Sequence, residues 1–274
     1  MDVIRVTRVG WKARRRLVAD VTVPVVLARL SRSLYLDVAG ELVWLGPPDS
    51  PLHCRAILAE PIPKLDDGAP VPARFDLSVA QEWRAPSPRG GAVSDVVGAS
   101  RTLLRRLTGL GTPEGFGNLL VGLRLPFPLD RAVDDARAFL AACVAGDAPT
   151  AVALADRLLG LGPGLTPAGD DLVGGAFFAR RVLVDGADPA PWRAAAETVR
   201  ARAVERTHRI GAALLGDLLD GEGYAPLHDL SVAFAGADEA AALQAAARLV
   251  RLGHSSGWDL LTGMLGALGS LPER

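Results

Sequence analysis

The sequence predicts an α+β protein in which a β-rich N-terminal domain, barrel- or sandwich-like, precedes an α-helical domain. Residues 1–80 lack helical periodicity and are interrupted by proline and glycine, whereas apolar residues recur at helical spacing from Ser94 onward. The loop Trp83–Gly91 separates the two patterns. We therefore expect domains at residues 1–90 and 91–274, although the composition of this loop also suits an ordinary surface linker.

The N-terminal domain is expected to consist of short strands that are rich in β-branched residues and bounded by proline. The dipeptide Ala39-Gly40 between two such runs is typical of a hairpin turn. The pattern does not determine the order of the strands. The expected strands are Val3–Val9, Leu17–Val26, Ser33–Val38, Glu41–Leu45, His53–Leu58 and Arg74–Val79.

The C-terminal domain is expected to be a set of amphipathic and buried helices. Leu172–Val184 is apolar enough to be buried, and Trp192–Leu219 is so long that we expect a break near Thr207–Gly211. Asp130 is a suitable N-cap for the helix that follows it. The expected helices are Val96–Leu107, Arg131–Ala145, Thr150–Leu159, Leu172–Val184, Trp192–Leu219, Asp238–Leu252 and Ser256–Leu268.

The composition indicates a globular protein, with 49% hydrophobic and 22% charged residues and a formal net charge of −1. Arginine is scattered and forms no basic stripe, so we expect no nucleic-acid partner. No apolar run is long enough to be a signal peptide or a membrane span. Cys54 and Cys143 lie far apart without metal-ligand spacing, which indicates a cytoplasmic protein.

The segment Leu159–Gly175 (LGLGPGLTPAGDDLVGG) contains more glycine than a helix–helix turn requires. One interpretation is structural: Thr166 caps a helix, Pro167 begins it, and the helix dipole favours Asp170 and Asp171 in its first turn. This leaves the glycines unexplained. The alternative is a loop whose backbone N–H groups face a ligand at a helix N-terminus. The segment is neither a Walker loop nor a dinucleotide fingerprint.

We expect one of the two adjacent acids to organise the turn and the other to face the ligand, because neighbouring helical residues point about 100° apart. Two carboxylates would repel a bare phosphate, so an anion would need a metal ion or an arginine beside it. Asp170 and Asp171 are candidate ligands for a divalent ion, although the sequence identifies no metal. The predicted substrate-binding residues of the loop are Gly162, Gly164, Leu165, Thr166 and Gly169.

A second candidate stretch is Gly253–Asp259 (GHSSGWD). Ser256 and Asp259 have the spacing of a capping box, which is the structural interpretation. It leaves Ser255 and His254 unexplained, and a histidine beside hydroxyls at a helix start can transfer protons. Ser255 and Ser256 are therefore predicted to bind substrate and His254, Asp170 and Asp171 to act in catalysis. Thr207 beside the expected helix break is a further candidate, although an exposed helix residue is an equally good interpretation.

Three stretches together, Gly162–Asp171 (GPGLTPAGDD), Thr207 with Ile210–Leu214, and Gly253–Gly257 (GHSSG), resemble the bacterial AllH-like family. This family, long described as a domain of unknown function, includes a subunit of oxamate carbamoyltransferase from anaerobic allantoin degradation, a route of purine catabolism. The resemblance implies FdrA-like and AllG-like partner subunits. It also implies a complex that interconverts oxalurate and phosphate with oxamate and carbamoyl phosphate.

One residue departs from the family pattern: Ala168 stands where the family usually has serine. That position therefore cannot provide a nucleophilic hydroxyl. The leading hypothesis is a carbamoyltransferase subunit that acts on a small ureido or carboxylate substrate. The alternatives are a non-catalytic scaffold or metabolite-binding subunit of such a complex, and a helical protein in which the motif is structural throughout.

Overall fold

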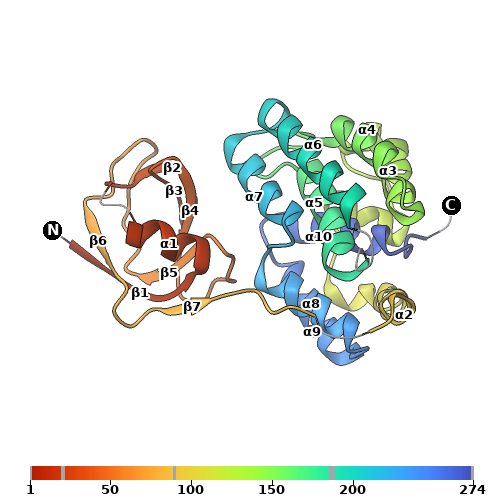
Figure 1. Ribbon diagram of the computed structural model, residues 1–274, viewed down its shortest axis with the longest axis horizontal. Coiled ribbons are helices and arrows are strands. Elements are labelled where there is room, and N and C mark those ends of the chain that lie inside the picture. The colour runs from red at the N-terminus through yellow and green to blue at the C-terminus, as the bar shows by residue number, and fades with distance from the viewer. Residues whose placement is uncertain (1, 20–21, 89–90, 185–188, 273–274) are drawn as a thin grey trace. The chain divides into compact units, whose positions relative to one another are not determined.

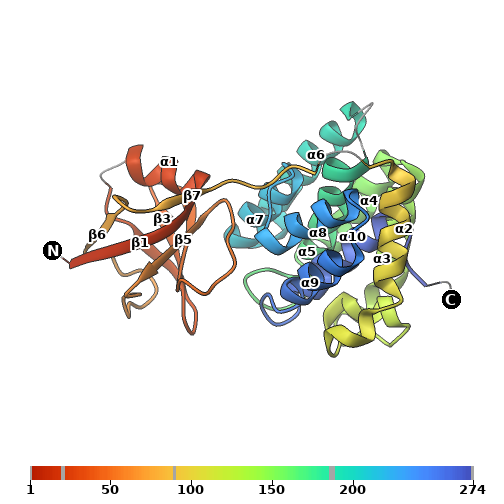
Figure 2. The same cartoon turned by 90° about the horizontal axis from the view of Figure 1, so that it is seen from below.

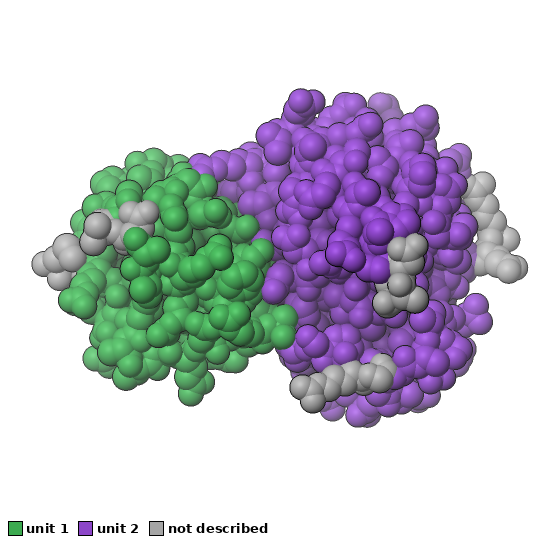
Figure 3. Space-filling model, in the orientation of Figure 1, with its two compact units in different colours: residues 1–85 green, residues 86–274 purple. Residues whose placement is uncertain are grey.

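The computed structural model describes residues 2–19, 22–88, 91–184 and 189–272. The chain forms two compact units, residues 1–85 and 86–274, coloured separately in Figure 3. A curled sheet followed by a helical region confirms the predicted α+β class (Figure 1). The division falls within the predicted loop Trp83–Gly91, and the expected boundary between residues 90 and 91 touches residues 89–90, which lie outside the described residues.

The N-terminal unit is built on one mixed, seven-stranded sheet with the order β2-β3-β4-β5-β1-β6, in which β7 also pairs with β1 (Figure 1). Irregular register between Val6 and Arg8 in β1, and between Val26 and Ala28 in β2, marks places where strands bend. The sheet curls into a half-barrel, which corresponds to the barrel-like alternative. The strands are β1 (Asp2–Gly10), β2 (Val25–Arg29), β3 (Leu34–Val38), β4 (Glu41–Gly46), β5 (Ala56–Glu60), β6 (Ala73–Asp76) and β7 (Gln81–Trp83).

The predicted hairpin is confirmed. Strands β3 and β4 pair antiparallel, and the turn between them places Ala39 at φ 49° and Gly40 at φ 87°. Positive φ at both central residues is the geometry that matches the twist of two-residue hairpins. The hairpin therefore follows from local turn chemistry, which explains why the sequence was sufficient to locate it.

The predicted strand Leu17–Val26 is wrong in its first part, and its residues 20–21 lie outside the described residues. Leu17–Ala19 instead end helix α1 (Trp11–Ala19), and β2 begins only at Val25. The segment of α1 is rich in lysine and arginine, which favour a helix. The guanidinium of Arg16 donates hydrogen bonds to the carbonyls of Val38 and Ala39, which fixes the helix against the hairpin turn.

The C-terminal unit is helical, as predicted, and no described helix of the chain is long and apolar enough to cross a membrane. Short 3-10 turns occupy Leu107–Leu110, Gly115–Val121 and Leu129–Ala132, and a π-helical turn extends α5 over Arg180–Val184. The helices are α2 (Val93–Leu104), α3 (Val133–Ala145), α4 (Ala148–Leu158), α5 (Ala168–Ala179), α6 (Ala190–Arg206), α7 (Arg209–Leu219), α8 (Ala225–Ala235), α9 (Glu239–Leu249) and α10 (Ser256–Ala267).

The predicted break near Thr207–Gly211 is confirmed, because α6 ends at Arg206 and α7 begins at Arg209. The prediction that Asp130 caps the following helix is wrong. A 3-10 turn that contains Asp130 precedes α3, and Ala132 takes the N-cap position of α3. Helix α8 was not predicted. The sequence pattern that indicates this helix is Pro226 near its start, followed by Leu227, Leu230 and Phe234 at helical spacing, all of which are buried.

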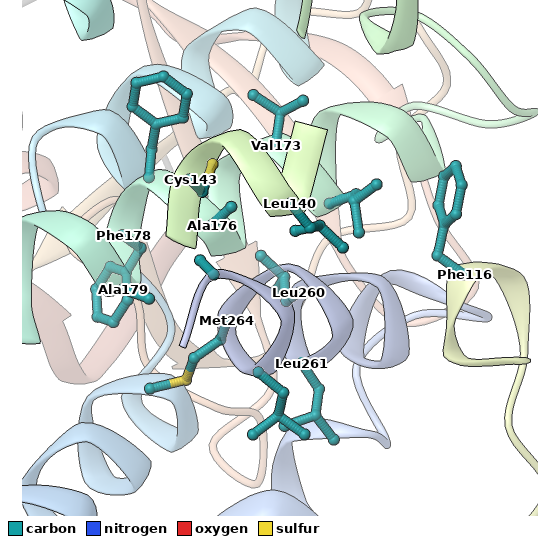
Figure 4. Close-up of a cluster of buried hydrophobic side chains, with 14 of the residues drawn as sticks. Phe116, Leu140, Cys143, Val173, Ala176, Phe178, Ala179, Leu260, Leu261 and Met264 are labelled. Atoms are coloured by element: carbon teal, nitrogen blue, oxygen red, sulfur yellow. The ribbon is translucent and has the colours of Figure 1, made fainter. Parts of the chain in front are cut away.

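Helices α5 and α10 form the centre of the C-terminal unit, with the other helices packed around them (Figures 1 and 2). All twelve residues of α5 are buried, which confirms the predicted buried helix over its α-helical part. Val173 and Phe178 of α5 join Leu260 and Met264 of α10 in one apolar core (Figure 4). The two backbones approach closely: a methyl group on Gly175 would lie 2.3 Å from Leu260 O, and one on Gly263 only 2.1 Å from Leu172 O.

Candidate functional site

The stretches singled out in the sequence meet where α5 and α10 begin. The Oγ1 atom of Thr166, in the loop before α5, lies 3.0 Å from the Oγ atom of Ser256, the first residue of α10. At the break between α6 and α7, the hydroxyl of Thr207 donates a hydrogen bond of 2.5 Å to Oδ2 of Asp170. The central loop, the helix break and the Gly253–Asp259 turn thus contribute to one place.

Neither of the two predicted helix caps forms. Helix α5 begins at Ala168, so Pro167 takes the N-cap position and Thr166 lies one residue too early to cap. Ser256 is the first residue of α10 itself, and Ser255 takes the N-cap position without a capping hydrogen bond from its side chain. The capping-box interpretation is therefore wrong. The Thr166 and Ser256 hydroxyls bond to each other instead.

Asp170 is buried and uses both carboxylate oxygens within the chain. Its Oδ1 accepts a hydrogen bond of 2.8 Å from the N–H of Gly160, and its Oδ2 accepts the one from Thr207. Burial raises the pKa of Asp170, and these two hydrogen bonds oppose the rise. Gly211 leaves the space that this carboxylate occupies, since a methyl group there would lie 2.8 Å from Oδ2. Asp170 joins α5 to the end of α4 and to the helix break.

Replacing Thr207 with valine should lower the free energy of unfolding by about 1–3 kcal/mol, because the buried Oδ2 of Asp170 would lose its hydrogen-bond donor. Thermal denaturation of the purified chain measures this effect. Thr198→Val is the control, because Thr198 is exposed and its hydroxyl bonds to Ala194 O of its own helix. Equal shifts in Tm for the two variants would contradict the structural role assigned to Asp170.

Asp171 differs from its neighbour, because it faces a second buried acid, Asp259 of α10. Burial raises the pKa of Asp171 well above its usual range, and the negative charges of Asp259 and Asp170 add to the rise. Burial also raises the pKa of Asp259, to about 7, with a contribution from the charge of Glu114. The hydroxyls of Ser256 and Ser255 lie against Asp171 and Asp259 respectively, where they favour the charged form.

The two acids leave acceptor atoms without donors. Oδ1 of Asp259 accepts a hydrogen bond of 2.6 Å from the N–H of Phe116, but its Oδ2 has no partner among the described residues. Oδ2 of Asp171 likewise has none. Both atoms are buried, with Asp171 5% exposed and Asp259 not exposed. An unsatisfied buried acceptor is costly. A proton held on the pair, in line with the raised pKa of each acid, supplies one donor, and a ligand from outside the chain can supply the others.

Asp259 and Glu114 were not identified as site residues from the sequence. Asp259 was assigned to a helix cap, although an acid among the apolar residues Leu260, Leu261 and Met264 was a usable signal. Glu114 belongs to the Gly/Pro-rich stretch 112–128, which folds back on α10. A methyl group on Gly115 would lie 2.3 Å from Oδ1 of Asp259, so glycine is needed for this approach.

His254 lies at the rim of the site rather than beside the buried acids. Its side chain is 90% exposed, and its Nδ1 lies 2.5 Å from Oε2 of Glu114. Glu114 links the two, because it contacts His254 and its charge raises the pKa of Asp259. Its predicted role in proton transfer stays a prediction.

The loop before α5 offers hydrogen-bond donors. Within the described part of the chain, the N–H groups of Gly162, Gly164, Leu165 and Thr166 donate no hydrogen bond. The N–H of Gly169, in contrast, donates to Leu161 O over 2.9 Å. Packing alone explains why residue 169 is glycine, because a methyl group there would lie 1.9 Å from Leu158 O.

The same region was the candidate site for a divalent ion. Among the described residues of 86–274, no three ligand atoms of His, Cys, Asp or Glu lie within 4.8 Å of one another. Asp170 already uses both of its oxygens for hydrogen bonds. A metal ion at Asp170 and Asp171 stays a prediction that no contact supports.

Residues 158–268 match the model of a protein family described as oxamate carbamoyltransferase subunit AllH. The matched region begins at the end of α4 and ends just after α10, so it includes the central loop, the helix break and both buried acids. The resemblance stated from the three motifs is confirmed over this region. No curated protein and no solved structure matches the chain.

Proposed function

Since residues 158–268 match that family, we propose that the chain is a subunit of an oxamate carbamoyltransferase-like complex and that the site between α5 and α10 takes part in its reaction. The match supports a role beside partner subunits. We further propose that these partners are FdrA-like and AllG-like proteins. The substrates would be oxalurate and phosphate, with oxamate and carbamoyl phosphate as products.

The reaction requires one proton to move. An oxygen of hydrogen phosphate forms a bond to the carbamoyl carbon of oxalurate, the bond from that carbon to the oxamate nitrogen breaks, and the proton lost by phosphate ends on that nitrogen. Groups with a pKa near the working pH are the best carriers of such a proton. Asp259, whose pKa burial raises to about 7, meets this requirement, and Asp171 beside it can share the proton.

The observation that carries the proposal is the buried pair of Asp171 and Asp259 inside the region that matches the family, in which the charge of Asp259 adds to the raised pKa of Asp171. Acids whose pKa is perturbed by burial and by a neighbouring charge cluster at functional sites. Thr166 and Ser256 are both partly exposed, their hydroxyls bond to each other, and the hydroxyl of Ser256 lies against Asp171. The donors of the Gly162–Thr166 loop would stabilise a carbonyl oxygen as negative charge develops on it.

The test is the rate at which the chain, combined with FdrA-like and AllG-like subunits, forms carbamoyl phosphate from oxalurate and phosphate. Asp171→Asn should lower kcat at least about 100-fold, in the range typical of general acid–base catalysis. Asp229→Asn is the matched control, because Asp229 is a partly exposed acid of α8 that pairs with Arg248. No product with all subunits present, or a wild-type rate for Asp171→Asn, would contradict the proposal.

A non-catalytic role as a scaffold or metabolite-binding subunit gives a different result in the same assay. In that case the complex would form product, but Asp171→Asn and Asp229→Asn would leave kcat equally unchanged. Thermal stabilisation of the chain by a partner subunit alone would then identify the scaffold, since anything that binds only the folded state raises Tm.

A further inference from the structure

We infer that the Asp171–Asp259 pair and the Gly162–Thr166 loop bind the uncharged carboxamide end of the substrate, and that its anionic groups are held elsewhere in the complex. This inference rests on the proposed function, which it narrows to one end of the substrate. It assigns to this chain a carboxamide site rather than a phosphate or carboxylate site.

Two buried carboxylate oxygens of the site lack hydrogen-bond donors. Oδ2 of Asp171 and Oδ2 of Asp259 are buried and accept no hydrogen bond from the residues that the structure describes. A site of this kind loses much of its affinity for a ligand that lacks the matching N–H groups, because its buried acceptors then stay unpaired. The –NH2 of a carboxamide supplies two donors on one atom.

The site is also crowded with carboxyl groups, those of Glu114, Asp170, Asp171 and Asp259. The charges of Asp259 and Asp170 raise the pKa of Asp171, and the charge of Glu114 raises the pKa of Asp259. Throughout the described chain, no lysine or arginine forms an ion pair with Asp170, Asp171 or Asp259. His254, two residues before α10, contacts Glu114. A carboxylate or phosphate held by this chain alone would meet repulsion without compensation at this place, so the phosphate that attacks the bound carbamoyl group would be held by basic groups of a partner subunit.

The site also distinguishes a carboxamide from a cationic amine. In the described chain, the N–H groups of the loop Gly162–Thr166 donate no hydrogen bond, and the Thr166 hydroxyl of this loop is bonded to Ser256, whose hydroxyl lies against Asp171. Donors and acceptors side by side complement a group that both accepts and donates, as the C=O and NH2 of an amide do. An ammonium group has no acceptor for the loop N–H groups.

A series of small ligands of nearly equal size tests this inference on the purified full chain. Oxamide has two carboxamides, oxamate has one carboxamide and one carboxylate, oxalate has two carboxylates, and ethylenediamine supplies amines. Isothermal titration should show binding of oxamide, with oxalate at least about 100-fold weaker. Oxamate should bind between the two, and ethylenediamine should bind no better than oxalate.

Two variants locate the binding. Asp171→Asn should weaken oxamide binding at least tenfold, because an amide side chain replaces one acceptor oxygen with a donor. Asp229→Asn should leave it unchanged. Three results would overturn the inference: no binding of oxamide, binding of oxalate or ethylenediamine as tight as that of oxamide, or unchanged binding by Asp171→Asn. If oxamide binds as expected while the complete complex forms no carbamoyl phosphate, the proposed function fails and the carboxamide site stands.

Discussion

Replacing Gly263 with alanine is expected to destabilise the C-terminal unit by about 3 kcal/mol or more, the upper end of what an extra methyl group costs in a packed core. The added methyl would lie 2.1 Å from Leu172 O and 2.8 Å from Ala176 N, which are backbone atoms of α5. Neither atom can move without displacing the buried helix to which it belongs. For a unit of this size the fall in Tm should be on the order of 10 °C.

Gly98→Ala is the control for this prediction. Gly98 also lies inside a helix, α2, but a methyl group there would meet nothing within 4 Å. Alanine is the better helix former by about 0.5–1 kcal/mol, so this variant should be more stable than the wild type. Opposite signs in the two changes of Tm are the expected result. A Gly263→Ala variant as stable as wild type would show that the close crossing of α5 and α10 is not required.

Asp259→Asn is expected to change how stability depends on pH. The pKa of Asp259 rises from 3.8 in the unfolded chain to about 7 in the folded one, so between pH 4 and 7 only the folded state holds this proton. The unfolding free energy of the wild type should therefore fall as pH rises through that window, by up to about 1.4 kcal/mol per pH unit. Below pH 4 this contribution is constant, and above pH 7 it is fully lost.

Asparagine does not titrate, and its Oδ1 can still accept the hydrogen bond from the N–H of Phe116. The Tm of Asp259→Asn minus that of the wild type should therefore increase from pH 4 to about pH 7 and then level off. Burial also raises the pKa of Asp170 and of Asp171, so these two acids contribute to the pH dependence that remains in the variant. Asp229→Asn should show no such trend, and a pH-independent difference for Asp259→Asn would refute the burial-induced shift.

The parts of the fold that local chemistry decides could be predicted from the sequence. The β3–β4 hairpin follows from Ala39-Gly40, and the break after Arg206 follows from a run too long for one helix. Helix α1 was missed because the β-branched residues after Leu17 resemble a strand. Its position depends instead on bonds from Arg16 to the distant carbonyls of Val38 and Ala39, which no local pattern shows.

The candidate site was partly predictable for the same reason. Glycine density and the three family motifs indicated Thr166, Asp170, Asp171 and Ser256, which the structure brings together. The sequence could not show which hydroxyl meets which carboxyl, since the first residue of each helix depends on tertiary packing. It also could not show that Asp259 faces Asp171, because that contact depends on how closely α5 and α10 cross.

The burial of every residue of α5 has a consequence for how the site works. A helix enclosed on all sides opens only when the whole unit unfolds, so its amide protons belong to the slowest-exchanging class of the protein. Asp170 and Asp171 lie in the first turn of that helix. Under the proposed function, the acid that faces the substrate is therefore held by the most persistent part of the structure.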